Sequence, residues 1–312
     1  MQSLWMLLAA FIFSIMGLSI KLAADNYSTS EIVMYRGIIG LFFMSFFIIH
    51  RGETIRTKYF SRHVLRSVTG VISAWLWFYA IAELPLATAI TLNYMSPIWM
   101  AVMLFVSGLW LGKKRFDWGL VAAVIMSFIG VALLLRPSIS ADQWIGGVMA
   151  LMSGILAALV YLQVRSLGRM GEPDSRVVFY LSLIGMIFGF LGTLYDGLFA
   201  GGSGPAWTSH SAKGILLLMT VGVSGTLAQM AMTRAYRMGK TLVTANLQYT
   251  GIIFSSGWGI LIWDDTLSWM GWLGIAVILA SGIAATYYNL SNLKSAPGAT
   301  PARDTDPIAT EL

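Results

Sequence analysis

The sequence predicts an all-α membrane protein with ten transmembrane helices, arranged as two inverted five-helix repeats around a central cavity. Three observations predict this fold: the composition, the alternation of basic loops, and a weak internal repeat. Hydrophobic residues make up 57% of the 312-residue chain and charged residues only 11%, against about 25% charged residues in a soluble domain. A soluble domain needs more charge to cover its surface, whereas a bilayer solvates an apolar exterior. The composition therefore excludes an ordinary soluble protein.

Ten apolar segments are long enough to cross a bilayer as helices, which takes about 20 residues each. Transmembrane β-strands are excluded, because they would be about ten residues long with strict alternation of apolar and polar residues. The first segment lacks a basic stretch before it and a clear cleavage site, so we expect a mature helix and not a signal peptide. The ten segments are residues 3–22, 31–49, 64–82, 88–110, 118–135, 145–165, 177–198, 213–234, 241–263 and 269–290.

The basic residues alternate between successive loops, and this alternation predicts the orientation. Loops that stay in the cytoplasm retain lysine and arginine. Sixteen of the 20 basic residues lie in or beside every second loop or in the tail, with Arg66 counted at the flank of the loop after the second span. Three lie on the opposite side, and Arg36 lies within a span. We therefore expect a multi-pass protein of a bacterial inner membrane with both termini cytoplasmic. The net charge of +6 then comes from the basic residues of the cytoplasmic loops, and we expect no nucleic-acid partner.

The internal repeat divides the ten spans into two groups of five. Glu83–Tyr94 aligns with Met238–Tyr249 at an offset of 155 residues, which places Asn93 on Gln248. Chance similarity between apolar helices is the alternative. Because five is odd, the second group enters from the opposite side of the membrane, as in the inverted repeats of many secondary transporters. The expected units are a first repeat over residues 1–141, a second over 142–293, and a disordered cytoplasmic tail over 294–312.

Two sequence phrases resemble the drug/metabolite transporter superfamily and, within it, the EamA-type permeases. The phrase A-x-x-x-L-P-L-A-x-A begins at Ala80 and precedes a helix with a mid-span proline, Pro97; the second phrase is Gly271–Ile283. The likeness covers about residues 3–290, although Gly112-Lys113 and Asp264-Asp265 stand where members often carry a glutamate after the fourth and ninth spans. The resemblance implies two EamA-type repeats around a cavity, which move small organic solutes by alternating access, with export more common than uptake.

Polar residues at membrane depth indicate where a solute would bind, because such residues usually face a cavity or a partner helix. The ninth span carries a polar face that includes Thr244 and Gln248. Asn93 and Gln229 lie in the fourth and eighth spans, and their amide groups donate and accept hydrogen bonds. Hydrogen bonds between helices are the alternative role for all of them.

Aromatic residues and one arginine complete the candidate set. Trp77 and Tyr249 can supply apolar contacts, although tryptophan and tyrosine also concentrate at bilayer interfaces. Arg36 is suited to a carboxylate or phosphate, but an arginine at this point is common in the resembled family whatever the substrate, so we favour a structural role. The candidate substrate-binding residues are Asn93, Gln248, Gln229, Trp77, Thr244, Tyr249 and Arg36.

A neutral polar cavity with aromatic edges favours amino acids or related amphipathic solutes. Uptake of a cofactor-like solute such as riboflavin, and a lipid or lipid-carrier flippase subunit, are the alternatives. The chain has no cysteine, no HExxH or GxSxG motif and no carboxylate pair within a span. We therefore expect no enzyme, no catalytic residue, no cofactor and no metal site. No acidic residue lies deep in a predicted span, so the sequence does not identify a coupling ion. The oligomeric state is also open, and the sequence is compatible with a monomer.

Overall fold

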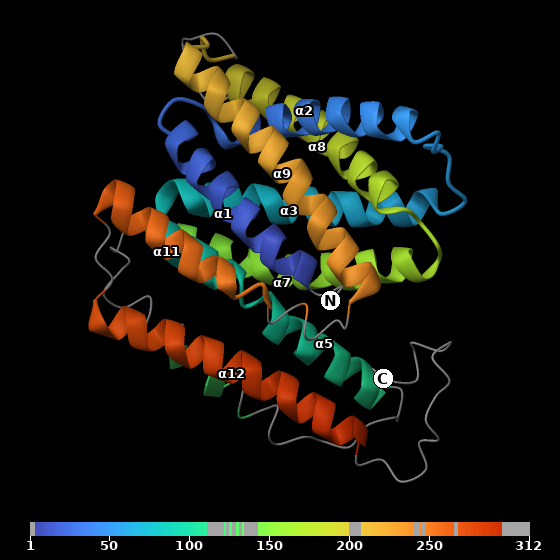
Figure 1. Ribbon diagram of the computed structural model, residues 1–312. Helices are drawn as coiled ribbons and strands as arrows, with labels where there is room; N and C mark the ends of the chain where they lie inside the picture. Colours follow the sequence, from blue (N-terminus) through green and yellow to red (C-terminus); the bar gives the residue numbers. More distant parts are fainter. Residues whose placement is uncertain are drawn as a thin grey trace.

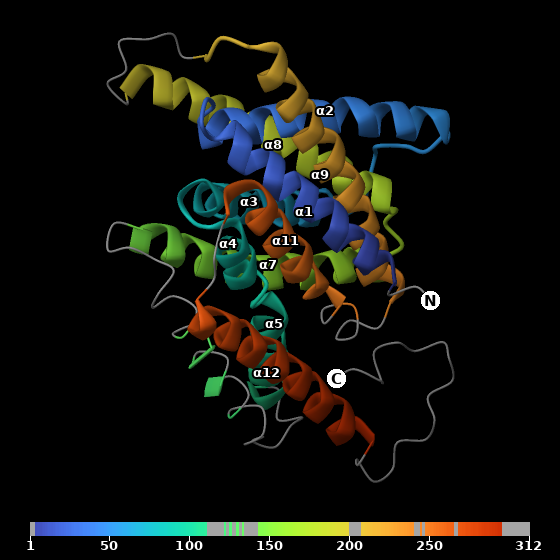
Figure 2. The same cartoon turned by 60° about the vertical axis from the view of Figure 1, so that its left-hand side comes forward.

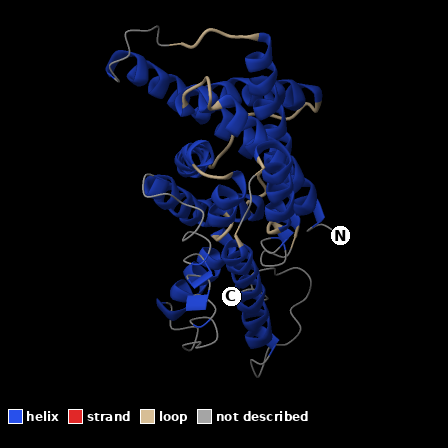
Figure 3. Ribbon diagram, turned by 90° about the vertical axis from the view of Figure 1, so that its left-hand side faces the viewer, coloured by secondary structure: helices blue, strands red, loops and turns tan. Residues whose placement is uncertain are grey.

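The computed structural model describes residues 4–110, 143–199, 207–239, 247–264 and 268–294, together with residues 122, 125, 126, 129, 130, 133 and 244 (Figure 1). Throughout this part of the chain the regular structure is α-helical, with loops joining the helices (Figure 3). The helices are α1 (Trp5–Ala23), α2 (Thr29–His50), α3 (Phe60–Glu83), α4 (Leu86–Asn93), α5 (Ser96–Trp110), α7 (Trp144–Arg169), α8 (Asp174–Phe199), α9 (Ala212–Met238), α11 (Thr250–Trp263) and α12 (Trp269–Lys294).

The described helices agree with the predicted spans wherever the two can be compared. Seven helical segments are long and apolar enough to cross a membrane: α1, α2, α3, α4 with most of α5, α7, α8 and α9. α11 and the first part of α12 are shorter apolar helices at the predicted ninth and tenth spans. The all-α, multi-pass membrane fold is therefore confirmed. Most of the predicted fifth span, and the tail beyond Lys294, lie outside the described residues.

Several contacts between the described helices are related to one another by exchange of the two halves of the chain. α2 packs along α8, and α4 packs against α11. The contact of α1 with α9 has its equivalent in the contact of α7 with α3, and the contact of α1 with α11 has its equivalent in that of α7 with α5. α12 lies beside α5 at the edge of the molecule (Figure 2). The central helices therefore come from both predicted repeats.

The crossing of α2 and α8 is so close that it requires glycine. A Cβ atom on Gly37 would lie 2.3 Å from the backbone nitrogen of Met186, and one on Gly189 would lie 2.4 Å from the backbone nitrogen of Met34. Small residues allow this kind of approach between membrane helices, where lipid supplies no hydrophobic drive for association. The glycines of this pair therefore set the distance between the two halves.

The fourth span is interrupted near its middle, where Pro97 predicts a bend. α4 ends at Asn93, and after two intervening residues α5 begins at Ser96 with Pro97 in its first turn, a position that tolerates the missing N–H. Gly154 of α7 packs against the backbone at the end of α4, where a Cβ on Gly154 would lie 2.9 Å from the Asn93 carbonyl oxygen. Gln248 and Tyr249 form a turn before α11 in the same way. The two interruptions fall at positions that the internal repeat aligns.

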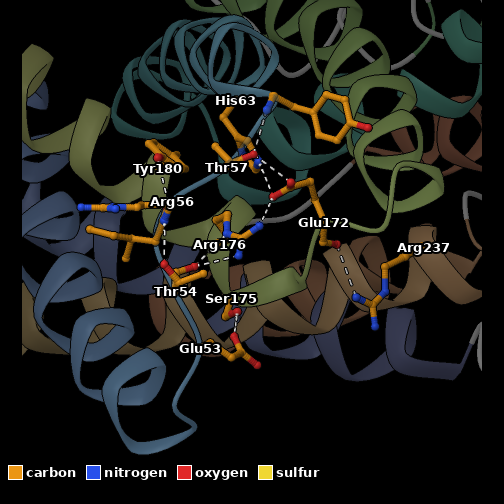
Figure 4. Close-up of polar contacts among 12 residues, drawn as sticks. Glu53, Thr54, Arg56, Thr57, His63, Glu172, Ser175, Arg176, Tyr180 and Arg237 are labelled. Atoms are coloured by element: carbon orange, nitrogen blue, oxygen red, sulfur yellow. Dashed lines mark hydrogen bonds and ion pairs between the residues drawn. The ribbon is translucent and has the colours of Figure 1, made fainter.

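A buried polar cluster lies at the end of the bundle that carries the α2–α3 and α7–α8 loops (Figure 4). The Glu172 carboxylate accepts hydrogen bonds from Arg176 at 2.7 Å, the Thr57 hydroxyl at 2.8 Å and His63 Nε2 at 2.9 Å. Glu172 is 5% exposed, and His63, which stands just before the predicted third span at 64–82, is fully buried. The cluster therefore ties α3 to the turn between α7 and α8.

Burial opposes ionisation of Glu172, but the hydrogen bonds from Arg176, Thr57 and His63 outweigh it and hold the pKa of this carboxyl below its ordinary value. The carboxylate therefore stabilises the fold above its unfolded-state pKa, and this contribution is lost as the pH falls through the folded-state pKa. We expect Glu172→Gln to lower the free energy of unfolding at neutral pH by about 3 kcal/mol, as removal of one partner from a buried ion pair does.

Thermal unfolding of the purified protein between neutral and acidic pH measures this effect. Glu172→Gln should also flatten the acid side of the stability profile, because the titrating group is gone. Glu83→Gln is the matched control and should keep the wild-type profile. Glu83 is exposed and lies at the opposite end of α3 from His63. A Glu172→Gln curve that runs parallel to the wild-type curve at acidic pH would contradict this account of the cluster.

Candidate functional site

A central cavity of about 70 Å³ lies where both interrupted spans meet the other central helices. Its walls come from α1, α2, α3, α4, α7, α8 and α9, together with the turn before α11. They include the third, fourth, eighth and ninth spans, which the sequence predicts to line a cavity. Small-molecule pockets usually enclose roughly 300–1,000 Å³, so this cavity is small for an organic solute.

Gln248 is the centre of a hydrogen-bond network in this cavity. Its side-chain amide nitrogen donates to the Ser96 hydroxyl and to the Tyr161 hydroxyl, each at 3.2 Å. Its amide oxygen accepts from the Tyr236 hydroxyl at 3.5 Å. Gln248 is 2% exposed and lies in the turn that interrupts the ninth span, so it joins α5, α7 and α9 at one point. A change in either interrupted span would alter this network directly.

Asn93 lies at the corresponding interruption of the fourth span. Its amide nitrogen donates to the Ser153 hydroxyl of α7 at 2.8 Å, and the Ser73 hydroxyl donates to the Ser153 carbonyl at 2.9 Å. Asn93, Ser73 and Gln229 of α9 all line the cavity and are buried. The amide groups of Asn93 and Gln229 therefore present hydrogen-bonding atoms to the same small volume.

Two arginine side chains also line the cavity. Arg36 of α2 is 9% exposed, and its guanidinium carbon lies 5.9 Å from the centre of the Phe78 ring. Arg66 of α3 is fully buried. The basic-residue count places Arg66 at a loop flank; in the structure it lies six residues after the start of α3, and its side chain is buried and lines the cavity. Arg66 lies four residues before Gly70, on the helix face that continues through Ala74 and Trp77, so this periodicity was the signal that could have identified it.

The structure brings five of the seven candidate residues to the cavity and leaves two outside its lining. Asn93, Gln248, Gln229, Trp77 and Arg36 line it. The other two are buried nearby: Thr244 donates a hydrogen bond of 3.4 Å to the Ala235 carbonyl, and Tyr249 is 5% exposed. Among the residues that the sequence did not select, Arg66, Ser73, Tyr94 and Tyr161 contribute polar atoms to the lining.

Comparison with known proteins finds transporters of similar length. The profile of the EamA-like transporter family matches residues 1–136. An uncharacterized transporter of Helicobacter pylori is 30% identical over 89% of this chain and 91% of its own length. The pseudopaline exporter CntI of Pseudomonas aeruginosa is 28% identical over 88% and 92%. A riboflavin transporter of Vibrio cholerae is 27% identical over 89% and 90%.

A solved crystal structure shares the fold. It superposes with a TM-score of 0.64 at 17% sequence identity, over 92% of this chain and 98% of its own. The match extends through both halves of the chain, and at this identity it bears on the fold alone.

Proposed function

Because the chain belongs to the EamA-like transporter family, we propose that it is a secondary transporter that exports small amphipathic metabolites, amino acids or related solutes, by alternating access. The solute binds in the central cavity between the two interrupted spans. The observation that carries this proposal is the Gln248 network, which places a hydrogen-bonding amide of one half against α5 and α7 at the point where both spans break. Discontinuous helices of this kind form the binding sites of many transporters.

Alternating access requires two arrangements of the same helices, and the packing supports an inverted repeat that could supply them. Exchanging the halves converts the contact of α1 with α9 into that of α7 with α3, and the contact of α2 with α9 into that of α8 with α3, and both interruptions fall at aligned positions. We propose the full architecture of ten helices in two inverted repeats on this basis, with both termini in the cytoplasm of a bacterial cell. The polar cluster around Glu172 is then a closed gate at the cytoplasmic end.

The opposite end of α2 carries a second polar cluster, which fits the same scheme. Glu31 caps α2 through a reciprocal pair of hydrogen bonds with Ser28. Its carboxylate also accepts from the Thr208 backbone N–H at 2.8 Å and from the Thr208 hydroxyl at 2.9 Å. His210 accepts or donates hydrogen bonds with Tyr27 and Tyr35 beside it. Both ends of the bundle therefore carry a polar cluster that joins the first half of the chain to the second.

Transport of riboflavin or a similar flat cofactor is the second candidate function. Two relatives are named riboflavin transporters, and aromatic side chains from α3 and the fourth-span turn, Trp77, Phe78 and Tyr94, line the cavity. A flippase role for a lipid or lipid carrier is a third, which would need a lateral opening between helices.

Flux into and out of proteoliposomes tests these proposals. Purified protein should accelerate the movement of at least one amino acid or amino-acid derivative from a broad panel, compared with protein-free liposomes. Saturation by riboflavin with no movement of amino-acid-like solutes would favour the second candidate. A panel of amino acids, vitamins and nucleosides without any flux would overturn the transporter proposal for metabolites.

A further inference from the structure

The cavity contains positive charge without a described counter-charge. Arg36 and Arg66 both line it, and none of its described lining residues is acidic. The Nε atom of Arg36 and all three guanidinium nitrogens of Arg66 are buried without a hydrogen-bond partner among the described residues. A buried charge is costly unless it is paired, so this arrangement favours an anionic occupant.

The buried nitrogen atoms of this lining that have no partner within the described part of the chain are all hydrogen-bond donors. Besides the two arginines they include the indole N–H of Trp77. Arginine carries five N–H donors and no acceptor, and an ionised carboxylate is acceptor-only. A carboxylate therefore satisfies these groups, whereas a neutral amide would direct its own N–H donors at some of them.

The two arginines reach the cavity from opposite ends of the bundle. α2 and α3 run in opposite directions (Figure 1). Arg36 lies seven residues after the start of α2, and Arg66 six residues after the start of α3, each about 10 Å from its own helix end by helical rise. An anion that crosses the membrane through this cavity would meet one guanidinium group from each side.

We propose that the transported solute carries a net negative charge, and that Arg66 together with Arg36 selects it by holding its acidic group. This inference rests on the proposed transport function and names its substrate class: organic anions such as acidic amino acids or N-acylated amino acids, in preference to zwitterions. The aromatic and apolar lining holds the remainder of the solute.

A net anion needs no coupling ion to leave a cell whose interior is electrically negative. One elementary charge moved across 100 mV corresponds to about a 50-fold concentration ratio at equilibrium. This agrees with the absence of acidic residues from the described cavity lining, because no titratable carboxylate is then required there for proton coupling. Transport should therefore carry current and respond to the membrane potential.

Paired probes of matched size test the proposal in proteoliposomes of zwitterionic phosphatidylcholine, which removes anionic lipid headgroups as a competing occupant. The pairs are L-glutamate with L-glutamine, and N-acetyl-L-phenylalanine with its neutral amide. In the wild type we expect the charged member of at least one pair to move about tenfold faster or more, the discrimination expected of one charge-assisted hydrogen bond. An imposed negative potential on the side that holds the anion should speed its movement.

Substitutions then assign the charge preference to the cavity. Arg66→Gln should abolish it, and Arg66→Lys should retain part of it. Arg62→Gln lies one turn earlier on α3 but is exposed, so it is the matched control and should behave as the wild type. Thermal stabilisation of each purified variant by the same probes gives a binding readout that does not depend on flux and shows that the variant is folded.

The outcomes separate this inference from the function on which it rests. Equal movement of charged and neutral members, or a charge preference that survives Arg66→Gln, would overturn the anion site while leaving transport intact. If no probe or panel solute moves, the proposed transport function fails, and stabilisation by the charged probes in the wild type but not in Arg66→Gln then decides whether the anion site exists.

Discussion

Replacing Gly37 with alanine should prevent the two halves of the protein from packing correctly. The added Cβ would lie 2.3 Å from the backbone nitrogen of Met186 and 2.7 Å from its Cα. Backbone atoms cannot rotate away as a flexible side chain can, so α2 and α8 must separate. Overpacking usually lowers the free energy of unfolding by about 1–3 kcal/mol, and we expect about 3 kcal/mol or more here because the α2–α8 contact joins the halves. Thermal unfolding and monodisperse yield after purification in detergent measure the loss.

Gly257→Ala provides the control for this substitution. Gly257 lies within α11, and a Cβ there meets nothing within 4 Å. Alanine is favoured over glycine in a helix by about 1 kcal/mol, so this variant should be as stable as the wild type or slightly more so. Equal stability of Gly37→Ala and Gly257→Ala would contradict the close crossing of α2 and α8.

Replacing Gln248 with alanine should reduce transport by about 10- to 100-fold, the equivalent of about 1–3 kcal/mol for a buried hydrogen-bond network that loses its central member. The change removes the donor to Ser96 and Tyr161 and the acceptor for Tyr236. It also removes an amide from the cavity lining, so both solute contact and the connection between the interrupted spans are lost. Initial rates of flux in proteoliposomes, with the apparent affinity for the solute, measure the effect.

Ser255→Ala is the matched control for Gln248→Ala. Ser255 is fully buried on α11, where its hydroxyl donates to the Ile252 carbonyl within the same helix, and it does not line the cavity. It should transport at nearly the wild-type rate. Wild-type flux and affinity in Gln248→Ala would show that the turn before α11 is not part of the binding site.

The sequence predicts most of the fold because each span is a long apolar segment whose length is fixed by the bilayer. The bend at Pro97 was also predictable, since proline removes one helical hydrogen bond. The corresponding interruption at Gln248 and Tyr249 has no proline, and it could be expected only from the internal repeat. The partner helices across the halves depend on close glycine contacts such as Gly37 with Met186, which sequence periodicity does not reveal.

Part of the candidate site was predictable from the sequence, as Asn93 and Gln248 show. Asn93 and Gln248 stood out because amides are rare at membrane depth, and both line the cavity. Arg66 was missed because an arginine near a helix end is usually a loop charge in the cytoplasm, and only the direction of its side chain distinguishes the two roles. Thr244 shares a helix face with Gln248 in an ideal helix, but its hydroxyl donates to the Ala235 carbonyl, and of the two only Gln248 lines the cavity.

Access to the cavity from the two sides of the membrane tests the central claim most directly, namely that this cavity is the transport path. The protein has no cysteine, so Ala74→Cys places a single thiol in the cavity lining without removing native ones. In membrane vesicles of opposite orientation, a membrane-impermeant thiol reagent should label Ala74→Cys from both sides, and a transported solute should slow the labelling. Arg56→Cys, in the exposed α2–α3 loop, should be labelled from one side only. Labelling of Ala74→Cys from a single side, or at a rate that no transported solute changes, would contradict alternating access through this cavity.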